Sequence, residues 1–199
     1  MIDGCMCGLI DHILDLSTKS SIKPKKVLDL GTGTGCLLLS VLEEFPNAVG
    51  VGVDKSSEAL DVARTNANQL GFGLRTQFIQ SNWLNNIDSS VHRNFDLIIS
   101  NPPYIAPADY PHLNPTVNAW EPVTALVANR EGLEEYDVIS KSIMEKKILD
   151  RDDGLLVFEI GKDQENDIVD IVQANGFKLD SMRKDLGGIF RSLAFRSHN

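Results

Sequence analysis

A glycine-rich stretch follows a short apolar run near the start of the chain, in the sequence VLDLGTGTG at residues 27–35. Gly31, Gly33 and Gly35 stand where a buried strand is expected to pass into a helix. Glycine lets the backbone approach a ligand closely, and the helix N-terminus offers unpaired N–H groups to negative charge. The spacing differs from the dinucleotide pattern G-x-G-x-x-G, whose third glycine would fall at Cys36. The stretch therefore predicts either a cofactor site or a plain strand-to-helix turn that needs small residues.

Segments with strand and helix patterns alternate along the rest of the chain. An opening helix is expected from its apolar spacing and should end near residues 17–20. Further helices are expected at 36–45, 56–70 (with Ser56 or Ser57 as N-cap), 132–149 and 164–176, and strands at 27–30, 48–54, 74–80, 96–100, 154–161, 178–185 and 191–196. The last two strands should pair antiparallel across the turn LGGIF. The predicted fold is α/β, a mostly parallel seven-stranded sheet with an antiparallel edge hairpin and helices on both faces, whose ligand crevice lies at the carboxyl ends of the strands.

The composition is that of a globular protein, with 42% hydrophobic and 24% charged residues in a chain of 199. This length suits a single core, and no segment is long and apolar enough to span a bilayer. The start of the chain lacks the features of a secretory or mitochondrial leader, so the cytoplasm is the expected location. The net charge of −9 would repel a nucleic-acid backbone, which makes nucleic acid an unfavoured partner. The oligomeric state is not indicated.

The cysteines and histidines give no sign of a metal site. Cys5, Cys7 and Cys36 form an odd set without a pairing framework, which suits a reducing compartment. No second Cys or His pair stands at ligand spacing to complete a site with Cys5 and Cys7, so no metal is expected. The histidines are scattered, and none is assigned a catalytic role.

Polar residues also follow the next two expected strands. Asp54 ends the second strand, where a carboxylate can accept hydrogen bonds from both hydroxyls of a ribose; the alternative is an exposed aspartate that caps the next helix. Asn82 and Trp83 follow the third strand, where an amide could pair with an adenine edge and an indole could cover it; the alternative is a turn asparagine and a core tryptophan. The glycine turn and Asp54 together favour an adenosine-bearing cofactor without choosing among them.

Asn101, two consecutive prolines and Tyr104 follow the fourth expected strand. Consecutive prolines fix φ and remove two backbone donors, so they give a rigid bend whose carbonyls stay free to accept hydrogen bonds. In a doubly wound sheet, Asn101 would lie beside the turn that bears Gly31. The Asn101 side-chain oxygen and the Pro102 carbonyl could then accept hydrogen bonds from one planar NH₂ group, with the Tyr104 ring against its plane. Such acceptors would orient a poor nitrogen nucleophile and stabilise its developing positive charge; the alternative is a structural Pro-Pro turn.

A long proline-bearing loop over 101–124 continues from this bend. A loop of this length is uncommon in a compact domain unless it has a function. We therefore expect the loop to belong to the site.

The chain resembles the HemK/PrmC-type protein-(glutamine-N5) methyltransferases, which modify the glutamine of the Gly-Gly-Gln tip of peptide chain release factors. The resemblance runs through VLDLGTGTG, GVDKSSEALDVARTNA, SNWL, FDLIISNPPYI, WEPVTAL, GLEEY, LLVFEIG and DLGGIFR. It covers nearly the whole chain from about Gly8 onward, and its distinctive part is the NPPY bend followed by Trp120-Glu121-Pro122. NPPY alone is shared with adenine-N6 DNA and RNA methyltransferases. The resemblance implies a class I methyltransferase (Rossmann-like) fold with S-adenosyl-L-methionine as cofactor.

The resemblance also implies which residues form the site. The glycine turn would hold the methionine end of the cofactor and Asp54 its ribose, and the expected cofactor-binding residues are Asp29, Gly31, Thr32, Gly33, Gly35, Asp54, Lys55, Asn82, Trp83 and Asn101. The expected catalytic residues are Asn101, Pro102 and Tyr104. The expected substrate-binding residues are Asn101, Pro102, Pro103, Tyr104 and Glu121.

Two departures from the family pattern affect these expectations. Asn82 stands where the family has an aspartate, and an amide accepts hydrogen bonds less strongly than a carboxylate, so a lower cofactor affinity is expected. The family's N-terminal helical domain, which helps to seat the release factor, is replaced by MIDGCMCG. We therefore expect residues 1–199 to form a single methyltransferase domain, with a leading helix over 1–20 and without that docking domain.

Three functions follow from the sequence. The first is methyl transfer to the glutamine N5 of a release factor. The second is an adenine-N6 nucleic-acid methyltransferase, which should carry a basic groove and is disfavoured by the charge of −9. The third is a cofactor-binding remnant without turnover.

Overall fold

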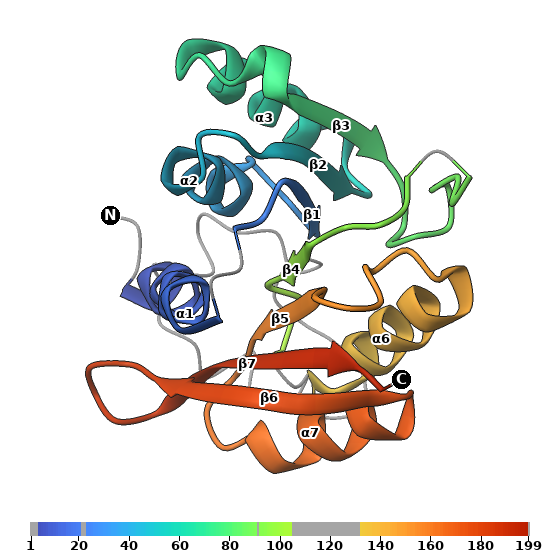
Figure 1. Cartoon of the computed structure of the whole chain (residues 1–199). Coiled ribbons are helices and arrows are strands. Elements are labelled where there is room, and N and C mark those ends of the chain that lie inside the picture. Colours follow the sequence, from blue (N-terminus) through green and yellow to red (C-terminus); the bar gives the residue numbers. More distant parts are fainter. Residues whose placement is uncertain (1–3, 21–22, 91, 105–131, 199) are drawn as a thin grey trace, which may run out of the picture.

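A seven-stranded sheet forms the centre of the computed structural model, which describes residues 4–20, 23–90, 92–104 and 132–198 (Figure 1). The strands are β1 Lys26–Leu30, β2 Val49–Asp54, β3 Thr76–Gln80, β4 Leu97–Ser100, β5 Leu155–Glu159, β6 Phe177–Lys184 and β7 Phe190–Ser197. Their order is β3-β2-β1-β4-β5-β7-β6. The first five strands in this order, β3-β2-β1-β4-β5, pair in parallel with one another, whereas β7 is antiparallel to both β5 and β6. The predicted parallel sheet with an antiparallel edge hairpin is confirmed.

Helices cover both faces of this sheet (Figure 1). They are α1 Gly4–Ser20, α2 Cys36–Glu44, α3 Ser57–Gln69, the short 3₁₀ helix η1 Gly73–Arg75, α6 Glu134–Lys146 and α7 Glu165–Ala174. Apolar residues of α1 and α2 pack on one face, and those of α6 and α7 pack on the other. The strands between them alternate: Leu97 and Ile99 of β4 belong to the first core, and Ile98 belongs to the second. This period of two buries both faces of a central strand.

The start of α3 and the ends of α3 and α7 follow ordinary capping chemistry. Ser56, one of the two predicted candidates, is the N-cap of α3, and its hydroxyl accepts a hydrogen bond from the Ala59 backbone N–H at 3.1 Å. Gly71 and Gly176 adopt positive φ just beyond α3 and α7, where each helix was expected to stop. Among the described residues, no helix has the length and apolar character needed to cross a membrane.

Several predicted boundaries differ from the observed ones by one to three residues, and the structure gives the reason for two of these differences. Leu74 and Arg75 were expected in the third strand but belong to η1, because the Arg75 N–H donates to the Phe72 carbonyl and closes a turn. The helix expected over 132–149 is shorter, because Lys147 takes a left-handed conformation (φ 52°) after α6. The loop expected over 101–124 is described only as far as residue 104 and is irregular there.

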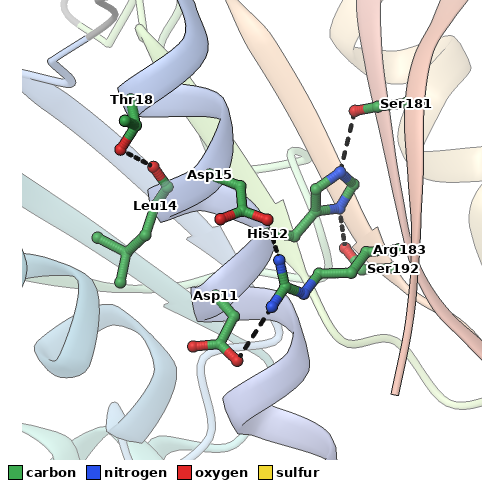
Figure 2. A network of polar contacts seen from close by, with 8 residues as sticks. All are labelled: Asp11, His12, Leu14, Asp15, Thr18, Ser181, Arg183 and Ser192. Atoms are coloured by element: carbon green, nitrogen blue, oxygen red, sulfur yellow. Dashed lines mark hydrogen bonds and ion pairs between the residues drawn. The ribbon is translucent and has the colours of Figure 1, made fainter. Parts of the chain in front are cut away.

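α1 is fastened to the edge hairpin by polar contacts as well as by its apolar residues (Figure 2). The His12 ring lies between two hydroxyls, with Nδ1 2.8 Å from Ser192 Oγ and Nε2 2.9 Å from Ser181 Oγ. The Arg183 guanidinium reaches from β6 to the carboxylates of Asp11 and Asp15 on α1. The imidazole is 4% exposed, so this junction contains a buried titratable group.

We expect this histidine to make stability depend on pH. Burial, assisted by the Arg183 charge, lowers the pKa of His12 from 6.5 to about 4. Between these values the unfolded chain binds a proton that the folded chain does not, so the free energy of unfolding should fall by roughly 3 kcal/mol as pH drops from 6.5 to 4. His12→Asn should remove this contribution. Chemical denaturation of both proteins at a series of pH values measures it, and curves with the same slope over this range would contradict the assignment.

Candidate active site

The carboxyl ends of β1, β2 and β4 meet at one edge of the sheet. Leu30 and Ser100, the last residues of β1 and β4, are partners in the parallel register. The Ser100 hydroxyl also donates to the Leu30 carbonyl at 2.7 Å, and both residues are buried. Gly31 and Asn101 are the next residues along these strands. The glycine turn and the NPPY bend therefore leave the sheet side by side, as a doubly wound sheet requires.

The glycine turn is held against β2 by backbone hydrogen bonds. The N–H groups of Gly31 and Thr32 both donate to the Val53 carbonyl, at 2.8 and 2.9 Å. Gly31, Gly33 and Gly35 all have positive φ, between 53° and 81°, a region that other L-residues rarely adopt. A Cβ atom at Gly33 would meet no atom of the described residues within 4 Å. The turn is thus a rigid corner, and the part of the chain that the structure describes leaves space beside its middle glycine.

Asp29 lies beneath this corner and is 1% exposed. Its Oδ2 accepts a hydrogen bond from the Thr32 hydroxyl at 2.7 Å, and its Oδ1 is buried with no hydrogen-bond partner among the described residues. Burial raises the pKa of this carboxyl to about 7, against the opposing effect of the Thr32 hydrogen bond. A cationic or hydrogen-bonding group of a ligand near the turn would relieve the cost of this incompletely paired carboxylate.

Asp54, at the end of β2, already binds two backbone groups. Its Oδ2 accepts from the Gly33 N–H at 2.8 Å and its Oδ1 from the Ser56 N–H at 2.9 Å. A carboxylate has about four acceptor positions, so both oxygens retain the capacity to accept ribose hydroxyls. The cap of the next helix is Ser56 rather than Asp54. The neighbouring Lys55 side chain is exposed.

Trp83 follows β3 in a left-handed conformation (φ 48°). Its indole lies against the glycine corner, since a Cβ atom at Gly31 would be 3.3 Å from Trp83 Cζ3. The indole Nε1 donates to Glu135 Oε2 at 2.6 Å, and the ring is also packed against the core. Trp83 therefore packs against the core and also lines the glycine corner. The preceding residue, Asn82, is exposed.

Glu135 was not among the sequence-predicted site residues. It lies in the first turn of α6, where an acidic residue is ordinarily explained by the helix dipole. The helix dipole does not predict the hydrogen bond that Glu135 accepts from a tryptophan 52 positions earlier in the chain. Its only sequence signal was membership of the GLEEY segment.

The NPPY bend begins exposed and turns inward. The Asn101 side chain is exposed, and none of the described residues forms a hydrogen bond with it. Pro102 is buried, Pro103 is half-buried, and Tyr104 is half-buried against the core. The remaining predicted substrate residue, Glu121, lies outside the described residues.

Residues 22–131 match the protein family described as "Methyltransferase domain". The chain belongs to this family. Its methyl donor is accordingly S-adenosylmethionine. The fold agrees: a structure titled as an S-adenosylmethionine-dependent methyltransferase from Clostridium acetobutylicum superposes with a TM-score of 0.66 at 13% identity, covering 98% of this chain and 92% of that one.

Curated relatives are more similar in sequence. The chain is 40% identical over 174 residues to a protein of Rickettsia felis named "Bifunctional methyltransferase", covering 87% of this chain and 32% of the relative. It is 37% identical over 191 residues to a protein of Agrobacterium fabrum named "Release factor glutamine methyltransferase", covering 94% of this chain and 63% of the relative. The chain thus spans only part of the length of these relatives.

The residues at this edge fit S-adenosylmethionine. The incompletely paired Asp29 carboxyl suits a ligand bearing an ammonium group, and the described residues leave room at Gly33 for the ligand to approach the backbone. The spare acceptor positions of Asp54 suit a ribose diol. This donor and acceptor set matches the two ends of the cofactor.

We expect the buried Asp29 to destabilise the domain as the pH rises from about 4 to neutrality. Its pKa is about 7 in the folded chain and 3.8 in the unfolded one, so its contribution to stability is fully present below pH 3.8 and is lost as pH rises to 7. Asp29→Asn removes the charge. The free energy of unfolding of the variant minus that of the wild type should rise by roughly 4 kcal/mol between pH 4 and pH 8. Denaturant titrations across this range measure the difference, and a pH-independent difference would refute it.

We also expect Glu135→Ala to free the Trp83 indole. Loss of a hydrogen bond to a charged acceptor should cost about 1 to 3 kcal/mol, and the tryptophan emission should shift to longer wavelength as the ring gains access to water. Fluorescence is measured with Trp120→Phe introduced into both the wild type and the Glu135→Ala variant. Trp83 is then the single tryptophan, since the chain has 2 tryptophans.

Glu134→Ala is the matched control for this experiment. It removes a carboxylate from the same first turn of α6 and so reproduces the change in helix-dipole stabilisation. Equal emission shifts in the two variants would mean that the Trp83 contact has no specific effect.

Proposed function

We propose that this chain transfers a methyl group from S-adenosylmethionine to the side-chain amide nitrogen, N5, of a glutamine in a peptide chain release factor. The observation that carries the proposal is the pairing of Leu30 with Ser100, after which Gly31 and Asn101 leave neighbouring strands at the same edge. A planar amide held at Asn101 would thereby lie beside the cofactor corner.

The cofactor would be held by residues of three strand ends. The glycine turn and Asp29 would take the methionine end, Asp54 the ribose, and Trp83 with Asn82 the adenine. When bound, the cofactor supplies a methyl group already activated on a positively charged sulfur and leaves as S-adenosylhomocysteine. A strong general base is not required for such an electrophile.

The acceptor would be held by the NPPY bend. An amide nitrogen is a poor nucleophile because its lone pair is delocalised into the carbonyl group. The Asn101 side-chain oxygen and the Pro102 carbonyl would accept hydrogen bonds from its two N–H groups, orient the nitrogen, and stabilise the positive charge that develops as the new N–C bond forms. The nitrogen then releases one proton to solvent. Tyr104 would line the pocket on the side of the amide plane.

The choice of a release factor as substrate is supported by the relatives. Several curated relatives at 34–39% identity carry the name "Release factor glutamine methyltransferase". The net charge of −9 supports a protein substrate over a polyanionic nucleic acid. A release factor is met in the cytoplasm, which is the location that we propose.

The test is transfer of a labelled methyl group from S-adenosylmethionine by the purified chain. The acceptors are a release factor, the same release factor with the glutamine of its Gly-Gly-Gln tip replaced by alanine, and adenine-containing DNA. Label should appear only in the unmodified release factor. Label in DNA would favour the adenine-N6 alternative, and cofactor binding without transfer to any acceptor would favour a domain without turnover.

We expect Asn101→Ala to reduce this transfer by a hundredfold or more, because one of two acceptors for the developing charge is lost. Calorimetry should find binding of S-adenosylhomocysteine within about threefold of the wild type. Asn85→Ala, at an exposed asparagine after β3, is the matched control and should retain full activity. A fully active Asn101 variant would remove this residue from the mechanism.

A further inference from the structure

The side-chain amide of Gln164 connects the NPPY bend to the loop that follows β5. Its Nε2 donates to the Tyr104 carbonyl at 3.1 Å, and its Oε1 accepts from the Gly161 backbone N–H at 3.0 Å. Gln164 is half-buried and stands immediately before α7. One planar group therefore joins the last residue of the bend to the carboxyl end of a core strand.

The backbone at Gly132 closes against the same point. Gly132 has a φ of 86°, and a Cβ atom there would overlap the Tyr104 carbonyl oxygen and lie 2.8 Å from Gln164 Nε2. Residues 104 and 132 flank the long segment between the bend and α6. Both flanking residues thus meet at Gln164, which is why a residue without a side chain is needed at position 132.

The NPPY bend is anchored at both of its ends. Asn101 follows β4 directly, so its backbone is held by the sheet at one side. Pro102 and Pro103 have fixed φ and no N–H group, so they add stiffness but donate no hydrogen bond to hold the bend. The far side of the bend is held at the Tyr104 carbonyl, where Gln164 donates. The position of the Pro102 carbonyl therefore depends on both anchors.

We propose that Gln164 is a positioning residue for methyl transfer: by clasping Tyr104 to Gly161, it fixes the bend that presents the Asn101 and Pro102 oxygens to the acceptor amide. This inference rests on the proposed function and adds a residue outside the glycine turn, the NPPY bend and the strand ends. The clasp needs a donor and an acceptor in one flat group. Glutamine supplies both, an ionised glutamate supplies only acceptors, and leucine supplies neither.

Two substitutions of Gln164 separate the halves of the clasp. Gln164→Glu retains an acceptor for the Gly161 N–H but loses the donor to Tyr104. Gln164→Leu loses both. Gln173→Glu and Gln173→Leu are the matched controls, because Gln173 is an exposed glutamine of α7 and these changes repeat the same differences in charge and polarity on the same helix.

The kinetic readout is the split between kcat and KM in transfer to the release factor. Both Gln164 variants should lower kcat by at least tenfold and leave the KM for S-adenosylmethionine within about threefold. The reason is that Gln164 contacts Tyr104 of the bend, which holds the acceptor amide in the proposed function. The Gln173 variants should match the wild type. Thermal melting and S-adenosylhomocysteine binding identify folded protein, and a folded Gln164→Glu variant with unchanged kcat would overturn the positioning role while leaving the proposed function intact.

A second readout needs no substrate. In ¹³C,¹⁵N-labelled protein, the Tyr104 carbonyl resonance should shift in both Gln164 variants, and the Gly161 amide should exchange at least tenfold faster in Gln164→Leu but not in Gln164→Glu. If the wild type methylates no release factor, the proposed function fails, and these resonances still decide the clasp. Resonances that stay unchanged in both variants would overturn it.

Discussion

The parallel pairing of β1 with β4 is the interaction on which the candidate site depends. Hydrogen bonding between these strands brings Leu30 opposite Ser100, and the buried Ser100 hydroxyl adds a bond to the Leu30 carbonyl at 2.7 Å. A slip of one residue would turn every side chain of β4 to the opposite face of the sheet. Because Leu97, Ile98 and Ile99 are packed into two separate cores, such a slip is costly. Burial on both faces therefore fixes the distance between the glycine corner and the bend.

Contacts between segments far apart in the sequence complete the edge of the sheet. Glu135 binds the Trp83 indole beside the glycine corner, and Gly132, three positions earlier, lies against the Tyr104 carbonyl. The chain at the start of α6 therefore contacts both the glycine corner and the end of the NPPY bend. Under the proposed function, a change of position in this one segment would affect both the cofactor and the acceptor amide.

One carboxyl group, that of Asp29, is buried close to the glycine corner at a cost in free energy. Asp29 is buried with one oxygen unpaired among the described residues, and its pKa rises to about 7 as a result. A core built for stability alone would replace such a group with an apolar residue. Its presence beneath a turn with open space beside Gly33 is consistent with a site that gains its remaining interactions from a ligand.

Much of this arrangement could be predicted from the sequence. The alternation of β and α patterns gave the order of the elements, and the glycines, Asp54 and Asn101 could be assigned to one edge because parallel strands joined by helices bring their carboxyl ends together. The residues that were missed, Glu135 and Gln164, have ordinary local explanations at helix starts. Their partners, Trp83 and Tyr104, lie 52 and 60 positions away, and no local pattern predicts such pairs. The third strand was predicted to start too early because a hydrogen bond closes the η1 turn at Arg75, and α6 was predicted to end too late because the left-handed backbone at Lys147 ends it.

The sequence by itself therefore determined the fold class and the set of residues at strand ends, since local propensity and hydrophobic period depend on neighbours along the chain. The tertiary structure alone decided how those residues are held. The contact of the Trp83 indole with the glycine corner, the clasp at Gln164 and the burial of Asp29 exist only when elements distant in the sequence pack together, and local propensity does not specify such packing.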